Sequence, residues 1–158
     1  MHKNIPDIYS SLQQIAWLFG GHGINGECCG DLSFVDFIAL KKVYENTAIT
    51  IQGIGNALNF TKSGATRIIN RLEIKGYVTR ENSPEDGRVC CVMITEKGVT
   101  VVSKIIKNYT EYLHETLKNL DTEAVEQVKK VLDTLLAELN KNKQCISDPL
   151  TVLEGECI

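Results

Sequence analysis

The sequence predicts a mainly helical fold that carries one small β ribbon. Apolar residues recur at the spacing of amphipathic helices over most of the 158 residues. The exception is residues 77–94, where two β-rich runs flank a tip of turn-forming residues. A hydrophobic content of 43% and a charged content of 23% are ordinary for a globular protein, so a chain of this length can build a core without disulfides.

The N-terminal third predicts two helices separated by a glycine-rich segment. Helical spacing of apolar side chains predicts the first helix over residues 5–19, and the glycines of residues 20–26 end it. Ser33 is expected to cap the second helix, with Asp36 at the capping-box position, and this helix fades near Asn46. The glycine-rich segment lacks the GxxxxGK[ST] pattern, so we do not expect it to hold phosphate.

Two short helices follow, joined by a tight turn. Thr50 is expected to cap a helix that reaches residue 58, although Gly53 and Gly55 weaken this helix by about 1 kcal/mol each relative to alanine. Thr61 is expected to cap the next helix, and Gly76 to end it in the left-handed conformation. Tertiary packing must therefore hold the first of the two helices.

The remaining elements are two strands and two long helices. Residues 77–80 and 89–94 predict the strands, with Pro84 and Gly87 in the tip between them. Thr95 is expected to cap a long helix that extends to residue 120. The last helix begins at Asp121 or Thr122 and runs to residue 139, and the tail from residue 141 onward is expected to be weakly ordered.

Charge and missing motifs narrow the classes of function. The net charge is −3, but residues 61–88 hold six cations and four anions, which leaves a local +2 on an acidic body. No run of about 18 apolar residues is present, and residues 1–7 lack signal-peptide features. We therefore expect a cytoplasmic protein with no membrane partner. No catalytic triad, P-loop or HExxH motif is present, so we do not expect an enzyme.

A basic helix followed at once by a ribbon with an arginine at its tip is the arrangement by which a winged helix-turn-helix holds duplex DNA. Ser63, Thr66, Arg67 and Asn70 stand at i, i+3, i+4 and i+7, so they share one helix face that suits the major groove. Arg67 is the expected bidentate reader of guanine. The alternative is a solvated helix face beside a hairpin, with charge there only for solubility.

The flanks of this face are expected to contact the DNA backbone and the minor groove. Thr61 and Lys62 would meet phosphate at the helix start, and Arg71 would contact the backbone further along. Arg88 at the wing tip would enter the minor groove. Asp86 is anionic, so it is expected to support an arginine of the wing by an ion pair.

Three segments resemble the multiple-antibiotic-resistance repressor (MarR) family. They are residues 61–80, residues 86–88 and residues 94–98, and their order and spacing fit that family. The resemblance covers residues 5–139. It implies a homodimer, transcriptional regulation that is commonly repression, and relief by a small effector or by cysteine chemistry. We expect the dimer to bind a pseudo-palindromic operator in double-stranded DNA.

The resemblance also implies a division of the chain. Residues 33–95 would form the winged helix-turn-helix DNA-binding domain. Residues 1–32 together with residues 96–141 would form a helical base for dimerisation, built from the N- and C-terminal helices. Residues 142–158 would be a cysteine-containing tail outside the general family pattern.

Six cysteines suggest a sensing function. Cys28, Cys29, Cys145 and Cys157 lie in the glycine-rich loop and the tail, which should both meet the dimer base, so they could share a thiophilic ion such as zinc, copper(I) or arsenite. The acidic flank of the first pair should raise the thiol pKa, an expectation that favours metal or metalloid binding over thiol oxidation. The competing class of function is a cysteine-rich metal-binding protein without a DNA role.

The other two cysteines, Cys90 and Cys91, are neighbours on a predicted strand. Their side chains should therefore point to opposite faces, so they are not expected to chelate together. One of them is expected to pack in the core.

Overall fold

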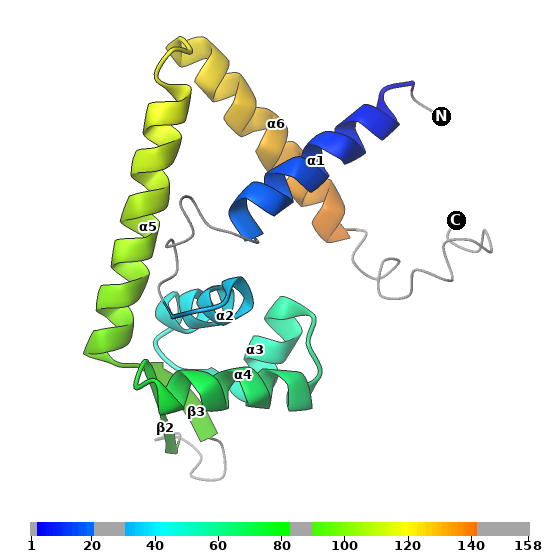
Figure 1. The fold of residues 1–158 in the computed structure, drawn as a ribbon. Coiled ribbons are helices and arrows are strands. Elements are labelled where there is room, and N and C mark those ends of the chain that lie inside the picture. The colour runs from blue at the N-terminus through cyan, green and yellow to red at the C-terminus, as the bar shows by residue number, and fades with distance from the viewer. Residues whose placement is uncertain (1–2, 21–30, 83–89, 142–158) are drawn as a thin grey trace, which may run out of the picture. The chain divides into compact units, whose positions relative to one another are not determined.

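The computed structural model describes residues 3–20, 31–82 and 90–141. They form six helices and three short strands, which confirms a mainly helical fold with a small β wing (Figure 1). The chain divides into two compact units between Tyr112 and Leu113, a boundary that falls inside a helix. The first unit contains the DNA-binding candidates.

The first two predicted helices are present as α1 (Ile5–Gly20) and α2 (Phe34–Tyr44). Ser33 caps α2, because its side-chain oxygen accepts a hydrogen bond from the backbone N–H of Asp36 at 3.1 Å. The carboxylate of Asp36 makes no return bond to close a capping box. It pairs instead with Arg71.

The helix-turn-helix consists of α3 (Ile51–Leu58) and α4 (Lys62–Ile74). Between them Asn59 takes a left-handed backbone conformation with φ of 57°. A Cβ on Gly55 would lie 2.9 Å from the carbonyl oxygen of Phe60, so a side chain here would push the turn apart. This close approach explains why residue 55 is glycine, although glycine lowers the stability of a helix.

Gly76 ends α4 as predicted, with φ of +73°. The N–H of Gly76 donates to the carbonyl of Glu73 at 2.9 Å, and the N–H of Tyr77 donates to the carbonyl of Leu72, also at 2.9 Å. These two bonds form a Schellman motif, in which the left-handed residue turns the chain sharply out of the helix. The chain therefore enters the wing directly beside the end of α4.

The sheet has three antiparallel strands in the order β1-β3-β2, one more than predicted. β2 (Val78–Asn82) pairs with β3 (Cys90–Ile94) along its whole length. β1 (Ile49–Thr50) pairs with the other edge of β3. A strand of two residues has no periodicity of its own, so only its partner β3 defines it. β2 also begins and ends later than the predicted residues 77–80.

The core of the first unit lies between α2, α3, α4, the sheet and the start of α5 (Glu96–Leu117), as Figure 1 shows for the helices around the wing. Amphipathic faces of all these elements meet there, which is how a small domain buries its apolar surface. The largest fully buried side chains are Leu40, Val43, Ile54, Ile69, Leu72, Val78, Val92 and Val102.

Thr95 caps α5 as predicted, because its hydroxyl oxygen accepts from the N–H of Gly98 at 3.1 Å. The helix ends at Leu117, short of the predicted residue 120. Within the first unit, Tyr109 of α5 stacks on Phe19 of α1 with ring centroids 5.6 Å apart. Its hydroxyl also donates to the Phe19 carbonyl at 3.2 Å. This contact fixes the end of α1 against α5.

α6 (Thr122–Lys141) is the last described helix. The sequence leaves the start open between Asp121 and Thr122. The helix begins at Thr122, and Asp121 caps it, since its carboxylate accepts from the N–H of Ala124 at 2.7 Å. Within the second unit, none of its side chains is buried, although its sequence is amphipathic. Among the described helices of the whole chain, none combines the length and apolar content needed to cross a bilayer.

Candidate nucleic-acid interface

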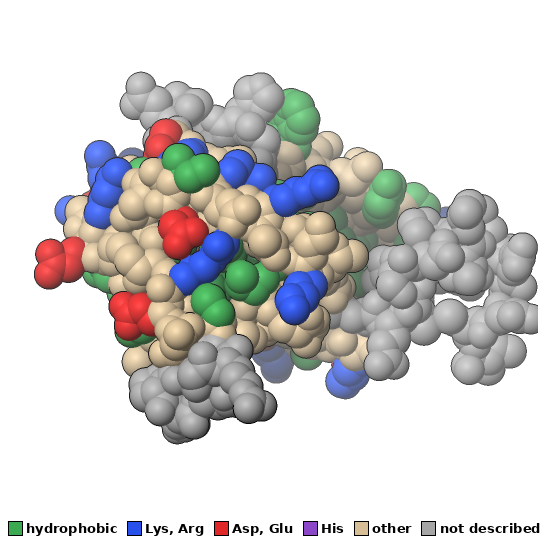
Figure 2. Space-filling model, turned by 90° about the horizontal axis from the view of Figure 1, so that it is seen from below, with side chains coloured by type: hydrophobic (Ala, Val, Ile, Leu, Met, Phe, Trp, Pro, Cys, Tyr) green, Lys and Arg blue, Asp and Glu red, His purple; other side chains and the backbone are tan. Residues whose placement is uncertain are grey.

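One side of α4 presents polar side chains to solvent, and its opposite side is buried. Ala65, Ile68, Ile69 and Leu72 face the core. The predicted DNA-binding residues of α4 lie on the other side, exposed except for the half-buried Thr66. We call these residues the recognition face: Thr61, Lys62, Ser63, Thr66, Arg67, Asn70 and Arg71. The view in Figure 2, from below the orientation of Figure 1, shows lysine and arginine side chains spread over this side of the molecule.

The start of the recognition face is organised by capping. The hydroxyl oxygen of Thr61 accepts from the N–H of Gly64 at 3.1 Å, which caps the helix as predicted. Its own proton remains able to donate to a phosphate oxygen. The hydroxyl of Thr66 donates to the carbonyl of Lys62 at 2.7 Å. The helix N-terminus therefore combines a lysine, a cap hydroxyl and backbone N–H groups, which together favour an anion.

Arg67 stands at the middle of the recognition face. It is exposed, and within the described residues it forms no hydrogen bond or ion pair. Its guanidinium can therefore extend away from the helix without breaking an internal contact. A planar fork of donors in this position matches the O6 and N7 acceptors of guanine.

Asn70 and Arg71 differ from Arg67, because each has an internal partner. Arg80 of β2 donates to the side-chain oxygen of Asn70. Arg71 pairs with Asp36 of α2, with 2.5 Å between Nη2 and Oδ1 and 3.2 Å between Nε and Oδ1. Asp36 is only 3% exposed, whereas the Arg71 side chain is 48% exposed. The hydrogen bond to Asp36 raises the pKa of Arg71 further above its usual value.

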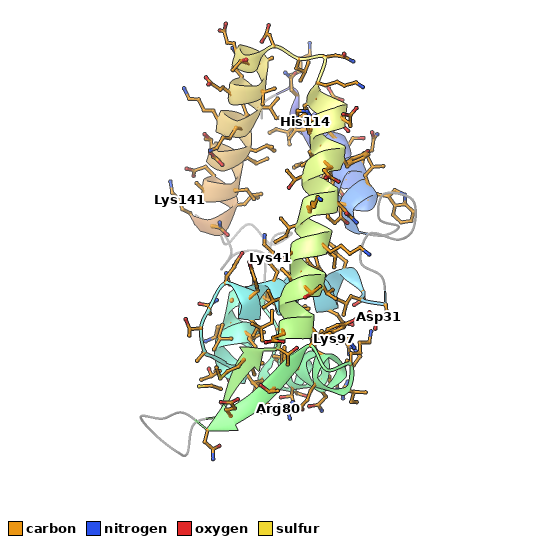
Figure 3. All side chains as sticks on the ribbon, turned by 90° about the vertical axis from the view of Figure 1, so that its left-hand side faces the viewer. Asp31, Lys41, Arg80, Lys97, His114 and Lys141 are labelled. Atoms are coloured by element: carbon orange, nitrogen blue, oxygen red, sulfur yellow. The ribbon has the colours of Figure 1, made fainter. Side chains whose placement is uncertain are left out.

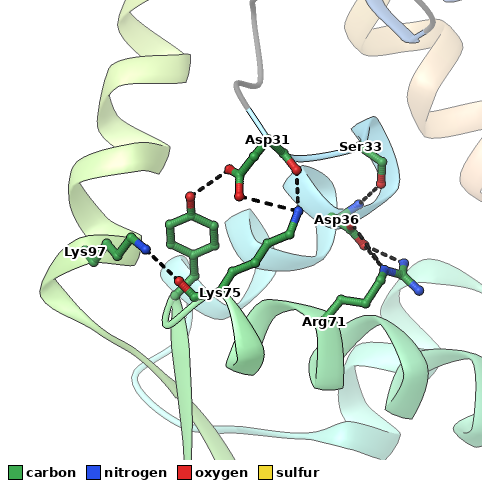
Figure 4. Close-up of polar contacts among 7 residues, drawn as sticks. Asp31, Ser33, Asp36, Arg71, Lys75 and Lys97 are labelled. Atoms are coloured by element: carbon green, nitrogen blue, oxygen red, sulfur yellow. Dashed lines mark hydrogen bonds and ion pairs between the residues drawn. The ribbon is translucent and has the colours of Figure 1, made fainter.

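A second contact ties the end of α4 to the segment before α2 (Figure 4). The hydroxyl of Tyr77 donates to Asp31 at 2.7 Å, and the ammonium of Lys75 lies 3.6 Å from the same carboxylate. Lys97 of α5 donates to the carbonyl of Lys75 at 2.7 Å and lies over the Tyr77 ring, 4.8 Å from its centroid. Asp31 and Asp36 thus attach the α2 region to α4 at two points.

The Tyr77–Asp31 bond has a predictable dependence on pH. The Tyr77 hydroxyl, and after it the charge of Lys75, lowers the pKa of Asp31 below 3.8. Burial, and after it Asp31, raises the pKa of Tyr77 above 10.0. The stabilisation from Asp31 is therefore present above about pH 3.8 and is lost as the pH falls further. The stabilisation that needs a neutral Tyr77 is present below pH 10.0 and is lost at higher pH.

Tyr77→Phe is accordingly expected to lower the free energy of unfolding by about 1 kcal/mol at pH 7, a modest loss because Asp31 is exposed. The gap between wild type and variant should be smaller at pH 3, because below about pH 3.8 the unfolded chain takes up a proton on Asp31 more readily than the folded protein does. Urea denaturation at the two pH values measures the gap. Tyr9→Phe, at an exposed tyrosine of α1, is the control. Gaps of equal size at pH 7 and pH 3 would exclude this contribution of Asp31.

Several predicted site residues lie outside the described residues. They are Arg88 and Asp86 of the wing tip and the four proposed thiol ligands Cys28, Cys29, Cys145 and Cys157. In the described ranges 3–20, 31–82 and 90–141, no group of three or more His, Cys, Asp or Glu side chains could hold a metal ion.

Cys90 and Cys91 lie on β3, as predicted. Cys90 is exposed and Cys91 is half-buried. The cysteine expected in the core is therefore only partly buried, because Val92 occupies the fully buried position of this strand.

Sequence reasoning missed the internal partners of the recognition face. Asp36 was identified as a capping residue only, and Asp31 and Arg80 were not identified as partners. Arg71 and Asp36 are 35 positions apart, and Tyr77 and Asp31 are 46 apart. No periodic pattern links such pairs. The available signal was the presence of two acidic residues beside the second helix and an excess of cations on the helix 61–76.

Comparison with known proteins finds a matching family model and similar transcriptional regulators. The MarR family model matches residues 32–90, from the start of the α2 region into β3. The HTH-type transcriptional regulator PapX of Escherichia coli is 29% identical over 122 residues, which cover 77% of this chain and 71% of PapX. The transcriptional repressor MprA of Escherichia coli (strain K12) is 29% identical over 111 residues, which cover 70% of this chain and 62% of MprA.

The fold is also that of solved structures. A MarR family protein from Bacillus stearothermophilus superposes with a TM-score of 0.68 at 21% identity, over 87% of this chain and 91% of that protein. The matched family model, the similar regulators and the shared winged-helix fold agree with one another. The chain therefore carries a MarR-family domain over residues 32–90 and is similar to MarR-family transcriptional regulators.

Proposed function

We propose that this protein is a sequence-specific DNA-binding repressor that acts as a homodimer on a pseudo-palindromic operator. The observation that carries the proposal is the recognition face: one side of α4 is anchored in the core, and the other presents hydrogen-bonding side chains and cations. Similarity to the repressor MprA supports the sign of regulation. Each α4 would enter one major groove, with half-sites about one helical turn apart.

The proposed contacts are of two kinds: those that read the base sequence and those that position the protein on the DNA backbone. Ser63, Thr66, Arg67 and Asn70 would face base edges, with Arg67 on guanine. Lys62 and the capped N-terminus at Thr61 would bind phosphate, which fixes the register of the helix without reading sequence. Arg71 has a guanidinium nitrogen beyond the two that contact Asp36, so it can also donate to the backbone. Arg88, supported by Asp86, would bind the minor groove.

Exposed apolar surface supports dimerisation. In the first unit, the side chains of Ile8, Ile15 and Leu18 on α1 are each about half exposed. In the second unit, α6 has no buried side chain. Both helices carry apolar residues at helical spacing, which is the pattern of a surface that a partner covers. A homodimer with two-fold symmetry would cover the same surface on each copy.

The experiment that tests the DNA assignment uses Arg67→Ala and Arg88→Ala. We expect Arg67→Ala to weaken binding to the operator by about tenfold or more and to relax base preference, because one bidentate contact is lost. Arg88→Ala should weaken binding on all sequences. Fluorescence anisotropy on labelled duplexes, over a series of salt concentrations, measures both effects.

Lys107→Ala is the matched control, since it removes an exposed charge from α5, outside the recognition face. If both arginine variants bind like wild type, the DNA assignment fails. The competing function, a cysteine-rich metal-binding protein without a DNA role, predicts weak binding to every duplex, whereas the DNA assignment predicts an affinity that falls steeply with salt.

We further propose that cysteine chemistry releases the protein from DNA. Cys28, Cys29, Cys145 and Cys157 supply soft thiolates, which favour zinc, copper(I) or arsenite over hard cations. Thiol oxidation is the competing chemistry, and a small organic effector is the competing signal. The acidic residues Glu27 and Asp31 beside the first pair argue for the metal or metalloid.

Native mass spectrometry tests the sensing proposal. Wild type and a variant with all four cysteines changed to serine would be measured with zinc, copper(I) and arsenite in turn. We expect wild type to gain the mass of bound ion on a dimer and to release operator DNA, and the serine variant to do neither. An equal response of the two proteins would exclude these thiols, while the dimer mass itself tests the assembly.

A further inference from the structure

Arg80 connects the wing to the recognition face. It lies on β2 and is labelled in Figure 3. Its Nη2 donates to the side-chain oxygen of Asn70, and its Nη1 lies 3.4 Å from the carboxylate of Glu73. Both partners are on α4. The Arg80 side chain is 29% exposed, and its Nε is buried without a hydrogen-bond partner in the described residues.

The hydrogen bond from Arg80 determines which way the side-chain amide of Asn70 points. The guanidinium of arginine carries only donors, so the amide atom that faces it must be the oxygen. The amide NH2 group is therefore turned away from Arg80, on the exposed side of α4. An asparagine without such a partner can rotate its amide and present either atom.

We propose that Arg80 is a positioning residue for sequence specificity, which fixes Asn70 so that its NH2 group donates to a base edge. The proposal rests on the proposed DNA-binding function. In the major groove guanine, adenine and thymine each offer an acceptor, whereas cytosine offers only the donor of its amino group. Held in this orientation, Asn70 prefers those three bases over cytosine on the strand that it faces.

Arg80 itself is poorly placed to bind DNA. Glu73 lies beside its guanidinium and offsets its charge, and the buried Nε shows that the head group is held against the protein. Drawing the guanidinium away from α4 to reach a phosphate would break both of these contacts. The function of Arg80 is therefore exerted through Asn70, and its loss should change base preference without changing the number of phosphate contacts.

Selection from a randomised duplex DNA library tests the proposal. Four proteins are compared: wild type, Arg80→Met, Asn70→Ala and the double variant. We expect Arg80→Met and Asn70→Ala to lose discrimination against cytosine at the same operator position, by about tenfold, the effect of one good base contact. The double variant should lose no more than either single variant. The slope of affinity against salt should be the same in all four proteins.

Two further variants separate positioning from folding. Arg80→Lys keeps a donor that can reach the Asn70 oxygen, so it should restore part of the preference that Arg80→Met loses. Asn70→Asp keeps an oxygen for Arg80 but replaces the outward NH2 group with an acceptor. It should shift the preference at that position toward cytosine, whose amino group can donate to a carboxylate. Asn70 is exposed, so this variant does not depend on repacking the core.

The outcomes distinguish this inference from the proposed function. If wild type selects a sequence and Arg80→Met leaves its base preference unchanged, the positioning function is excluded while the DNA-binding function stands. The same holds if Arg80→Met and Asn70→Ala alter different operator positions. If wild type selects no sequence at all, the proposed function fails and this inference fails with it.

Discussion

Gly98→Ala is expected to lower the free energy of unfolding by about 2 kcal/mol, although it places a better helix former in α5. A Cβ at this position would overlap the carbonyl oxygen of Tyr77 and would lie 2.7 Å from Cγ1 of Ile94. The first of these atoms belongs to the backbone. It cannot turn aside as the end of a flexible side chain would, so the start of α5 or the chain at Tyr77 must move.

The magnitude follows from two opposing terms. Forcing a methyl group into a well-packed site costs about 1 to 3 kcal/mol, and a contact this close to backbone belongs at the upper end. Alanine returns at most about 1 kcal/mol of helix propensity. Movement at Tyr77 is also costly, because its carbonyl accepts from the N–H of Thr95 at 3.0 Å and its hydroxyl holds Asp31. The packing term is therefore larger.

Urea denaturation followed by circular dichroism measures this loss, and Gly64→Ala is the matched control. A Cβ on Gly64 would meet Thr61 Oγ1 at 3.4 Å and Phe60 Cβ at 3.6 Å, which are ordinary contacts. The control should keep or raise stability by up to about 1 kcal/mol. If Gly98→Ala is as stable as Gly64→Ala, the backbone contact at Tyr77 does not constrain this helix.

The contrast between local and distant contacts explains what the sequence could predict. Ser33, Thr50 and Thr61 were predicted as caps, and each accepts from an N–H three positions later in the chain. Gly76 was predicted to end α4, and its left-handed φ confirms this. Each of these features needs only the residues around it, because capping and helix termination are properties of one turn of chain.

Contacts between elements could not be predicted from the sequence, because the tertiary fold determines which residues become neighbours. The strand β1 is defined only by its pairing with β3. The recognition face was predicted as a set of side chains, yet two of its members, Asn70 and Arg71, are held by residues of β2 and α2. The pattern of α4 indicates which side faces solvent, but not which of its cations also serve the fold.

The Asp36–Arg71 pair illustrates this dual use, and Arg71→Ala is expected to lower the free energy of unfolding by about 2 to 3 kcal/mol. The substitution leaves the carboxylate of Asp36 almost fully buried without its partner, and an unpaired buried charge is costly. Asp36→Ala should cost less. The Arg71 side chain is 48% exposed, so its guanidinium can exchange Asp36 for water.

A double-mutant cycle of Asp36→Ala and Arg71→Ala measures the interaction, which should appear as a positive coupling of about 1 kcal/mol or more in urea denaturation. Purely additive losses would contradict it. The same proteins separate folding from DNA binding. Arg71→Ala should reduce the slope of log affinity against log salt by about one, since one phosphate contact is removed, whereas Asp36→Ala should leave the slope unchanged.

Lys62→Ala completes the comparison, because it removes a cation of the recognition face that has no ion-pair partner in the described residues. It should reduce the salt slope by about one and change stability little. If Arg71→Ala destabilises the protein but leaves the salt slope at the wild-type value, Arg71 serves only to join α4 to α2. If Arg71→Ala lowers both the stability and the salt slope, the same guanidinium binds DNA and also holds α4 in place.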